Sequence, residues 1–290
     1  MQEPKIQEVS EIEAVPVEEQ NVIFKPNVGP QTEFLAAGER EVLYGGSAGG
    51  GKSYAMLADP LRYMGHPSFS GLLLRHTTEE LRELIFKSKE MYPQIWKGIK
   101  WSERKMQWEA PSGARLWMSY LDRDDDVLRY QGLAFSWIGF DELTQWSTPY
   151  AWNYMRSRLR STAHDLPVYM RATTNPGGPG HQWVKKMFID PAPYGKQFDA
   201  TDIESGNVLS YPKGHSKAGQ ALFKRRFIPA RLSDNPYLSE QGDYEAMLLS
   251  LPEHQRKQLL EGDWDIKEGA AFTEFNRDIH VVEPFHIPHN

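Results

Sequence analysis

Short apolar runs alternate with longer polar and amphipathic segments between residues 41 and 174. Five of these runs are rich in strand-forming residues, and they cover residues 41–44, 71–75, 114–120, 135–140 and 168–174. The first, second and fourth are almost continuously apolar, which is typical of strands buried on both faces. The pattern therefore predicts five strands, most of them in the interior of a sheet.

Segments with signals for helices lie between several of these strands. Thr77 followed three residues later by Glu80 is a capping-box pattern, and apolar residues at helical spacing come after it. Thr148 before Pro149 predicts a second helix start, with an N-cap followed by proline at the first helical position. Strands that alternate with helices favour an α/β fold with a mostly parallel sheet.

Changes in composition and in hydrophobic periodicity divide the chain into four parts. Residues 1–20 contain six Glu and little apolar periodicity, which indicates a mobile acidic tail. The α/β domain then occupies residues 21–205. Beyond about residue 205 we expect no further strand, and helical periodicity within 236–262 predicts a small helical subdomain over residues 206–266. Residues 267–290 are expected to form a connector toward another unit.

The composition excludes several classes of function. Forty per cent hydrophobic residues in a chain of 290 are ample for a large core. The absence of cysteine excludes a disulfide framework, thiolate metal clusters and cysteine nucleophiles. No apolar run is long enough for a membrane span, and the acidic N-terminus does not resemble a signal peptide. A net charge of −6 gives no overall attraction to DNA, so DNA contact requires a local basic patch.

A glycine-rich stretch directly after the first predicted strand matches the phosphate-loop pattern G-x-x-x-x-G-K-[ST]. It consists of Gly46, Ser47, Ala48, Gly49, Gly50, Gly51, Lys52 and Ser53. The glycines let successive N–H groups converge on phosphate oxygens, and the start of the following helix adds its positive end. We expect Lys52 to reach the β- and γ-phosphates of ATP and the Ser53 hydroxyl to ligate Mg²⁺.

Two carboxylates, Asp141 and Glu142, follow the fourth predicted strand. Ligands of open α/β sheets bind at the carboxyl ends of the strands, so this pair is expected beside the phosphate loop. Asp141 would hold Mg²⁺ together with Ser53, and Glu142 would act as the general base for the attacking water. A base in this position favours hydrolysis over phosphoryl transfer to a substrate. Without the loop, the same pair reads as the solvated end of a strand.

Other polar residues are candidates for nucleotide contacts. Thr173, Thr174 and Asn175 end the fifth predicted strand, where they could sense the loss of the γ-phosphate, although an ordinary turn explains them equally well. The amide of Gln31 matches the donor and acceptor on the adenine edge, and Phe24 or Phe34 could pack against the ring. From chemistry alone, an ordinary surface glutamine is the alternative.

Phosphoryl transfer also benefits from an arginine that neutralises charge in the transition state, often supplied by a neighbouring subunit. The candidates are Arg129, before the acidic pair, and Arg156, Arg158 and Arg160, after it, with Arg129 and Arg158 placed first. Arg75 and Arg171, at or near strand ends, are outside candidates. Two short basic clusters, at residues 185–186 and 224–226, are candidates for contact with a DNA backbone. A solvated face is the commoner explanation of such clusters.

Taken in order, these motifs resemble the large subunit of tailed-phage terminases, the ATP-driven motor that packages double-stranded DNA into an empty capsid. The resemblance extends from about Phe24 to the end of the chain. It rests on the stretches FKPNVGPQTEF, EVLYGGSAGGGKS, LLLRHTTEELREL, RYQGLAFSWIGFDELTQW, RATTNPGGPGHQWVKKMF, ARLSDNPYL, LLEGDWD and GAAFTEFNRDIHVVEPFHIP.

The resemblance implies a P-loop NTPase fold of the ASCE (RecA-like, additional-strand) type, with a small helical lid. Residues 46–53 would be Walker A, and Asp141 with Glu142 would be Walker B and its catalytic glutamate. The segment that includes Thr174 and Asn175 would couple hydrolysis to movement, and Gln31 would read the adenine. The implied cofactors are ATP and Mg²⁺.

The resemblance also implies partners and a location. The partners are double-stranded DNA, a portal protein, a small terminase subunit and further copies of the chain in a ring on the portal. No membrane is involved, and the motor would work in the host cell cytoplasm, transiently at the portal vertex of the procapsid.

Two departures from the family pattern matter. Many relatives carry an arginine inside the loop where this chain has Ser47 and Ala48, so that role is vacant or has moved elsewhere. Relatives continue into an RNase H-like nuclease, whereas this sequence ends near where such a domain would begin, and we expect no nuclease activity from it. The alternatives are a helicase core, disfavoured because no second RecA-like domain follows, and a nucleotide-gated scaffold with low turnover.

Overall fold

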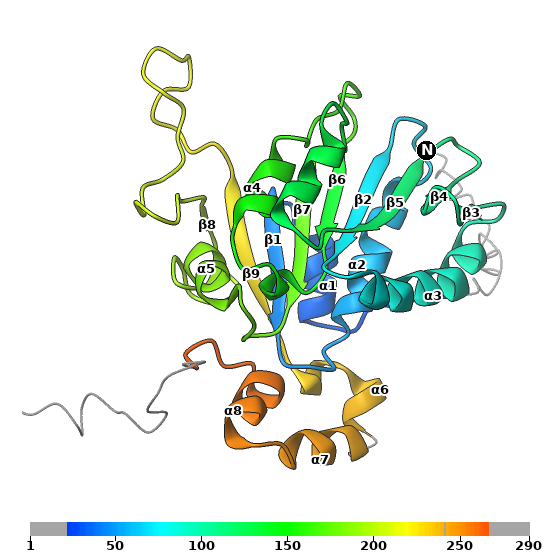
Figure 1. Ribbon diagram of the computed structural model, residues 1–290, viewed down its shortest axis with the longest axis vertical. Helices are drawn as coiled ribbons and strands as arrows, with labels where there is room; N and C mark the ends of the chain where they lie inside the picture. Colours follow the sequence, from blue (N-terminus) through cyan, green and yellow to red (C-terminus); the bar gives the residue numbers. More distant parts are fainter. Residues whose placement is uncertain (1–21, 241, 267–290) are drawn as a thin grey trace, which may run out of the picture.

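A nine-stranded sheet forms the centre of the protein, in a computed structural model that describes residues 22–240 and 242–266 (Figure 1). The strands are β1 (Glu41–Gly46), β2 (Ser70–Arg75), β3 (Lys100–Ser102), β4 (Gln107–Glu109), β5 (Arg115–Tyr120), β6 (Trp137–Phe140), β7 (Tyr169–Thr174), β8 (Gln197–Asp199) and β9 (Lys224–Ala230). Their order is β3-β4-β5-β2-β6-β7-β1-β9-β8. The six strands from β5 to β9 in this order are parallel, whereas β3, β4 and β8 pair antiparallel at the two edges.

The sequence correctly predicted five inner strands of this sheet, β1, β2, β5, β6 and β7. All five predicted strands are present with bounds shifted by two residues at most, and all six residues of β1 are buried. Strand β7 lies between β1, which leads into the glycine-rich loop, and β6, which leads into the acidic pair. This inserted strand is the mark of the additional-strand type of P-loop fold, so the predicted fold class is confirmed.

Strand β9 corrects the expectation that strands stop near residue 205. It pairs in parallel with β1 in the interior of the sheet, and Glu41 lies opposite Arg225. The sequence KRRFIPA begins with three cations and contains Pro229, so it does not look like a buried strand. The strand forms nevertheless, because the buried guanidinium of Arg225 lies 2.7 Å from the buried carboxylate of Glu41.

Helices cover both faces of the sheet. The α-helices of the described residues are α1 (Pro30–Ala36), α2 (Lys52–Ala58), α3 (Thr78–Ile95), α4 (Tyr150–Arg156), α5 (His181–Val184), α6 (Pro236–Ser239), α7 (Asp243–Leu249) and α8 (Glu253–Arg256). The Thr77–Glu80 capping box is confirmed at the start of α3, with both reciprocal hydrogen bonds present. At α4 the prediction was wrong by one position, because Pro149 itself is the N-cap.

Alternate residues of the strands enter two separate apolar clusters. In β2, Leu72 and Leu74 join the cluster that contains Trp152, while Leu73 joins the cluster that contains Tyr92. Because successive side chains of a strand point to opposite faces, these clusters lie on opposite sides of the sheet. The sheet is therefore covered on both faces, as its nearly continuous apolar strands require.

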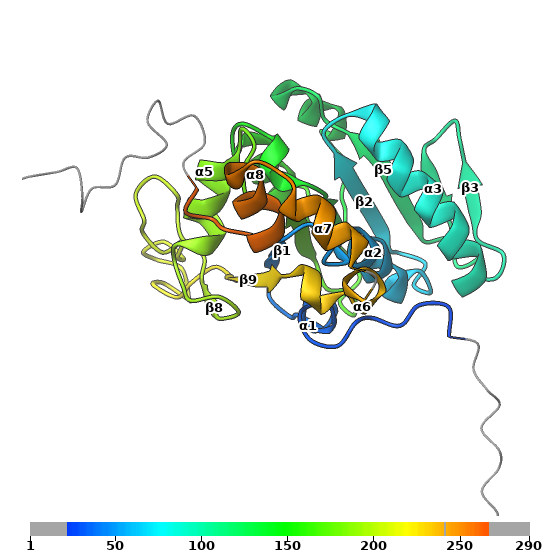
Figure 2. The same ribbon diagram turned by 90° about the horizontal axis from the view of Figure 1, so that it is seen from below.

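The predicted helical region near the C-terminus consists of short helices. Three helices, α6, α7 and α8, are followed by a π-helical turn (Lys257–Glu261), and Leu248 is buried whereas Met247 is 66% exposed. These helices group beneath the sheet in Figure 1, and Figure 2 shows them in front of the strand ends. The predicted acidic tail (1–20) and connector (267–290) lie outside the described residues. No helix in the described part of the chain is long and apolar enough to cross a membrane.

Candidate active site

The glycine-rich loop follows β1, and side chains from three other parts of the chain donate hydrogen bonds to its backbone. Hydrogen bonds fix three successive carbonyl oxygens of the loop: Asn235 Nδ2 donates to Gly49 at 2.7 Å, Tyr44 Oη to Gly50 at 2.7 Å and Gln31 Nε2 to Gly51 at 2.9 Å. Within residues 22–240 and 242–266, the N–H groups of these three glycines have no acceptor. Unpaired, successive N–H groups of this kind form an anion-binding nest.

The turn into the loop requires glycine at its first position. Gly46 has φ +137°, and a Cβ atom there would lie 2.3 Å from the carbonyl oxygen of Ala230 in β9. The next N–H group, that of Ser47, donates to the same carbonyl at 2.8 Å. The neighbouring strand β9 thus fixes the start of the phosphate loop.

Lys52 begins α2 and reaches back across the loop. Its side chain is buried, and Nζ donates to the carbonyl oxygen of Ser47 at 2.6 Å and to Asn175 Oδ1 at 2.7 Å. Burial lowers the pKa of Lys52, and the negative charges of Glu142 and Asp141 partly oppose that shift. The ammonium therefore lies between the loop and the end of β7, where a bound phosphate would compensate its burial.

Asp141 offers a carboxylate oxygen for a metal ion. The residue is fully buried, and Oδ1 accepts a short hydrogen bond from Thr173 Oγ1. Within the described residues Oδ2 accepts no hydrogen bond, and Arg75 Nε lies 3.2 Å away from it. The described residues contain no cluster of three or more His, Cys, Asp or Glu side chains that could hold a metal ion alone. A single carboxylate and the hydroxyl of Ser53 fit Mg²⁺, which is usually completed by water and substrate phosphates.

Glu142 is held in an unusual backbone conformation next to this carboxylate. Its φ of 60° and ψ of 57° lie in the left-handed region, which non-glycine residues rarely adopt. Its Oε2 accepts a hydrogen bond from the Asn175 N–H at 3.3 Å. Burial and the charge of Asp141 raise the pKa of Glu142, while Lys52 and Arg75 oppose the rise. Local strain together with a perturbed carboxyl is a frequent property of active sites.

The end of β7 connects these groups to one another. Thr173 donates to Asp141, and Asn175 accepts from Lys52 and donates to Glu142. Thr174 turns away from them and shares a 2.7 Å hydrogen bond with the Thr144 hydroxyl. The structure therefore brings together the residues that the sequence singled out at the ends of three separate strands.

Gln31 also lies at this site, whereas Phe34 does not. Its amide bridges the carbonyl oxygen of Gly51 and the N–H group of Asn27, the latter at 2.6 Å. Phe34 is buried and stacks on Tyr44 with a 5.2 Å separation of the ring centroids, so it is part of the core. The suggestion that Phe34 packs against adenine was wrong.

The two first arginine candidates lie away from the loop of their own chain. Arg129 is exposed, pairs with Asp126 at 3.5 Å and donates to the carbonyl oxygen of Tyr120 at the end of β5. The carbonyl oxygen of Arg158 accepts a hydrogen bond from the N–H group of Phe135, just before β6. Arg158 therefore lies at the amino end of β6, whereas Asp141 follows its carboxyl end. Neither residue contacts the acidic pair.

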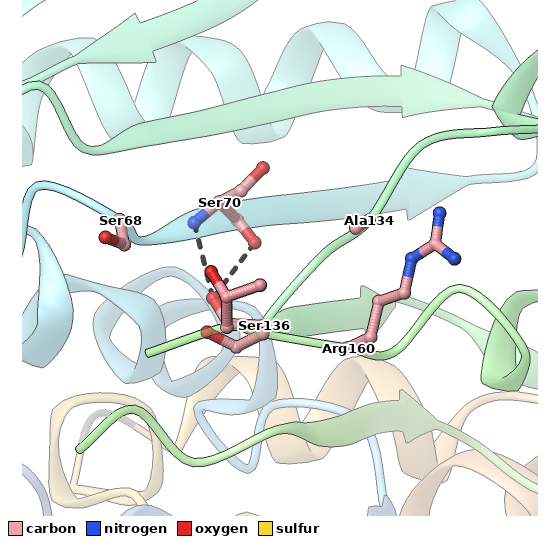
Figure 3. Close-up of a pocket in the computed structure, with 7 residues that line it drawn as sticks. Ser68, Ser70, Ala134, Ser136 and Arg160 are labelled. Atoms are coloured by element: carbon pink, nitrogen blue, oxygen red, sulfur yellow. Dashed lines mark hydrogen bonds between the residues drawn. The ribbon is translucent and has the colours of Figure 1, made fainter. Parts of the chain in front are cut away.

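The other arginines divide into structural residues and one residue at the site. Arg156 pairs with buried Glu41, and Arg171 is buried beside Asp59. Arg160 borders a pocket of about 230 Å³ at the start of β2 and β6, with its guanidinium away from the hydroxyls of Ser70 and Ser136 (Figure 3). Arg75 is thus the one arginine of the described residues that contacts the acidic pair.

Four of the five cations in the two basic clusters are paired with carboxylates. In the second cluster, Lys224 lies 3.1 Å from Asp199. Arg225 is buried and pairs with Glu41, and Arg226 pairs with Glu33. Lys185 is likewise paired with Asp190 and Asp265, at 2.7 and 3.1 Å. Arg225 is an internal ion-pair partner within a strand, so it does not belong to an exposed basic patch.

The helices after β9 contact the phosphate loop directly, which the sequence did not predict. The N–H group of Ala48 donates to the carbonyl oxygen of Leu259 at 2.6 Å. Gly262 lies so close that a Cβ atom would be 2.7 Å from the nitrogen of Ser47. The only available signals were an asparagine before Pro236 and the glycine of LLEGDWD, neither of which indicates a partner.

Comparisons with known proteins agree with this geometry. The family model described as "Terminase large subunit, T4likevirus-type, N-terminal" matches residues 43–279. No curated protein matches the sequence. Among solved structures, the large terminase of a thermophilic bacteriophage in complex with ADP is similar with a TM-score of 0.60 and 19% identity, over 91% of this chain and 60% of that chain.

Two further structures share the fold. The same thermophilic-phage terminase in complex with ATP-gamma-S has a TM-score of 0.57 and 17% identity, over 91% of this chain and 59% of that chain. The large terminase ATPase domain of Thermus phage P74-26 has a TM-score of 0.51 and 13% identity, over 83% of this chain and 94% of that chain. The chain therefore spans about 60% of the length of the first of these terminases. Because the family model covers most of the sequence, this protein belongs to the T4likevirus-type terminase large subunits and corresponds to their N-terminal part.

Proposed function

We propose that this chain hydrolyses ATP at the site formed by the phosphate loop, Asp141 and Glu142. Asn175 is the observation that carries the proposal, because its side chain binds Lys52 while its N–H group binds Glu142. One residue thus connects the group expected on the γ-phosphate with the group expected on the attacking water. A nucleotide-binding site without hydrolysis has no need of this connection.

Each group in the site has a defined chemical task in this proposal. The unpaired N–H groups of the loop would bind phosphate oxygens, and Lys52 would neutralise the β- and γ-phosphates. Asp141 and Ser53 would hold Mg²⁺, which supplies charge neutralisation when bound. Glu142 would orient the attacking water and accept its proton. Loss of the γ-phosphate would change the contacts of Asn175, which offers a route for coupling hydrolysis to movement.

We further propose that the hydrolysis drives double-stranded DNA into a preformed capsid. Membership of the terminase large subunits supports this motor function, and the thermophilic-phage relative was determined with ADP and with ATP-gamma-S. The partners would be DNA, a portal protein, a small terminase subunit and other copies of the chain in a ring on the portal. The motor would act in the host cytoplasm, at the portal vertex of the procapsid. No feature of the described residues favours a helicase core or a low-turnover scaffold.

Replacing Lys52 tests the nucleotide site. Lys52→Ala is expected to weaken Mg·ATP binding by about 10- to 100-fold, because one charge-assisted contact to phosphate is lost. Isothermal titration calorimetry with ATP-γ-S measures the affinity. Lys97→Ala serves as the control, since Lys97 is exposed and distant in sequence from the loop. An affinity equal to that of the wild-type chain in Lys52→Ala would remove the basis of the proposed function.

Mixing of variants tests whether Arg129 acts on a neighbouring subunit. Arg129→Ala chains retain Glu142, whereas Glu142→Gln chains retain Arg129, so a mixture can form one complete site between two chains. If Arg129 acts in trans, ATP turnover in the mixture should exceed the sum of the two separate preparations. The same experiment with Arg158→Ala tests the second candidate. Turnover that is simply additive for both variants would exclude these two arginines as contributors across subunits.

A further inference from the structure

Arg75 ends β2 and lies directly beside the acidic pair. Strand β2 is the neighbour of β6, and the N–H group of Asp141 donates to the carbonyl oxygen of Leu74 at 3.0 Å. The side chain of Arg75 is 11% exposed, and its Nε lies 3.2 Å from Oδ2 of the fully buried Asp141. The guanidinium therefore occupies the side of the site that faces away from the phosphate loop.

This contact leaves hydrogen-bonding groups of both partners unsatisfied. Nε and Nη1 of Arg75 are buried and donate no hydrogen bond within the described residues, and Oδ2 of Asp141 accepts none. Buried donors without an acceptor cost free energy, and native proteins contain few of them. The geometry is that of a charge contact between two groups, each of which retains hydrogen-bonding capacity for another partner.

The unsatisfied oxygen of Asp141 and the unsatisfied guanidinium of Arg75 match the metal ion and the phosphate of a magnesium nucleotide. Oδ2 of Asp141 suits a hard cation, and the planar guanidinium suits two oxygens of a phosphate. A divalent cation on this oxygen would repel the guanidinium of Arg75, so a bound metal would free the guanidinium for an anion. The anion nearest to the acidic pair would be the terminal phosphate, because the α- and β-phosphates lie at the loop, on the far side of β7 from β6.

We propose that Arg75 binds the γ-phosphate of the nucleotide held by its own chain. The inference rests on the proposed ATP site and assigns to it a third cationic partner for the phosphates, besides Lys52 and Mg²⁺. In the structure this arginine contacts Asp141. With nucleotide bound, it neutralises the terminal phosphate from the side opposite to Lys52. A residue with this role distinguishes ATP from ADP, since ADP has no γ-phosphate.

Nucleotide discrimination is therefore the property to measure. Arg75→Met removes the charge and keeps much of the side-chain volume, and its affinities for ATP-γ-S and for ADP are determined by calorimetry in Mg²⁺. We expect ATP-γ-S binding to weaken by about 10- to 100-fold and ADP binding to stay within about threefold of wild type. Arg75→Lys restores the charge without the planar fork, and it should recover part of the lost affinity. Arg82→Ala, on an exposed position of α3, is the control and should change neither affinity.

The possible results separate this inference from the proposed function. Retained ADP binding shows that the Arg75→Met site is folded, and a selective loss for ATP-γ-S supports the γ-phosphate contact. Equal affinities to wild type, or equal losses for both nucleotides, would refute it and leave Arg75 as a counter-charge for Asp141. If Arg75→Met does not fold, Arg75→Lys decides by the same comparison. If the wild-type chain binds neither nucleotide, the proposed ATP site itself is wrong.

Discussion

Glu142→Gln should lower steady-state ATP turnover at least about 100-fold and leave ATP-γ-S affinity close to that of the wild-type chain. The amide has the shape of the carboxylate, so its oxygen can still accept the hydrogen bond from Asn175. It cannot accept a proton from the attacking water, which is the task that the proposal gives to Glu142. A phosphate-release assay under saturating ATP, with calorimetry on the same preparations, measures both quantities.

A matched exchange on the surface controls for general effects of losing a negative charge. Glu79→Gln changes an exposed glutamate in the first turn of α3, where no contact with the site exists, and it should leave turnover unchanged. The assignment of Glu142 as the base would be falsified if Glu142→Gln hydrolysed ATP at the wild-type rate. A parallel loss of binding and turnover would instead indicate that Glu142 shapes the site.

Glu41→Gln is expected to lower the free energy of unfolding by about 3–5 kcal/mol, without any direct role in the site. Glu41 is fully buried at the start of β1 and contacts two guanidinium groups, those of Arg225 and Arg156. The amide leaves both cations without a counter-charge, and Arg225 is itself only 1% exposed. Urea denaturation followed by circular dichroism gives the difference. Glu33→Gln, which breaks the more exposed ion pair with Arg226, should cost no more than about 1 kcal/mol.

The contribution of Glu41 also depends on pH with a defined sign. Burial alone would raise the pKa of Glu41, but the charges of Arg225 and Arg156 outweigh it and hold this pKa below the ordinary value of 4.5. A lowered folded-state pKa stabilises the fold above the unfolded-state pKa, and the stabilisation is lost as the pH falls through the lowered value. The difference between wild type and Glu41→Gln should therefore stay constant from neutral pH to about 4.5 and shrink below it. A difference that grew on acidification would contradict the ion-pair explanation.

Local patterns predicted the chemical groups of the site, because each group lies in a sequence motif together with its neighbours. A strand, a glycine-rich loop and a lysine are contiguous in residues 41–53, and Asp141 with Glu142 directly follows an apolar strand. Parallel strands bring their carboxyl ends to one edge, so the meeting of these segments follows from the fold class. The interactions of Asn175 with both Lys52 and Glu142 are a consequence of that edge.

Pairings between distant segments could not be predicted, since neither partner carries a local signal for the other. Arg225 looks like part of a solvated basic cluster until Glu41, 184 positions earlier in the chain, is placed opposite it. The same limit applies to the contact between Ala48 and Leu259, where only backbone atoms meet. Arg75 was one of six arginine candidates, and only the pairing of β2 with β6 distinguishes it from the rest.

The position of β9 determines how the sheet would respond to a mechanical load. The helices α6, α7 and α8 follow Ala230 at the end of this strand, and they lie beneath the strand ends in Figure 1. A force that pulls these helices away from the sheet acts along the axis of β9. β9 runs parallel to β1, and the paired residues extend from Glu41–Arg225 to Gly46–Ala230. The hydrogen bonds between the two strands are therefore loaded in shear, so that they share the force instead of opening one at a time. Tension between the helices and the phosphate loop can thus be sustained without unzipping the sheet.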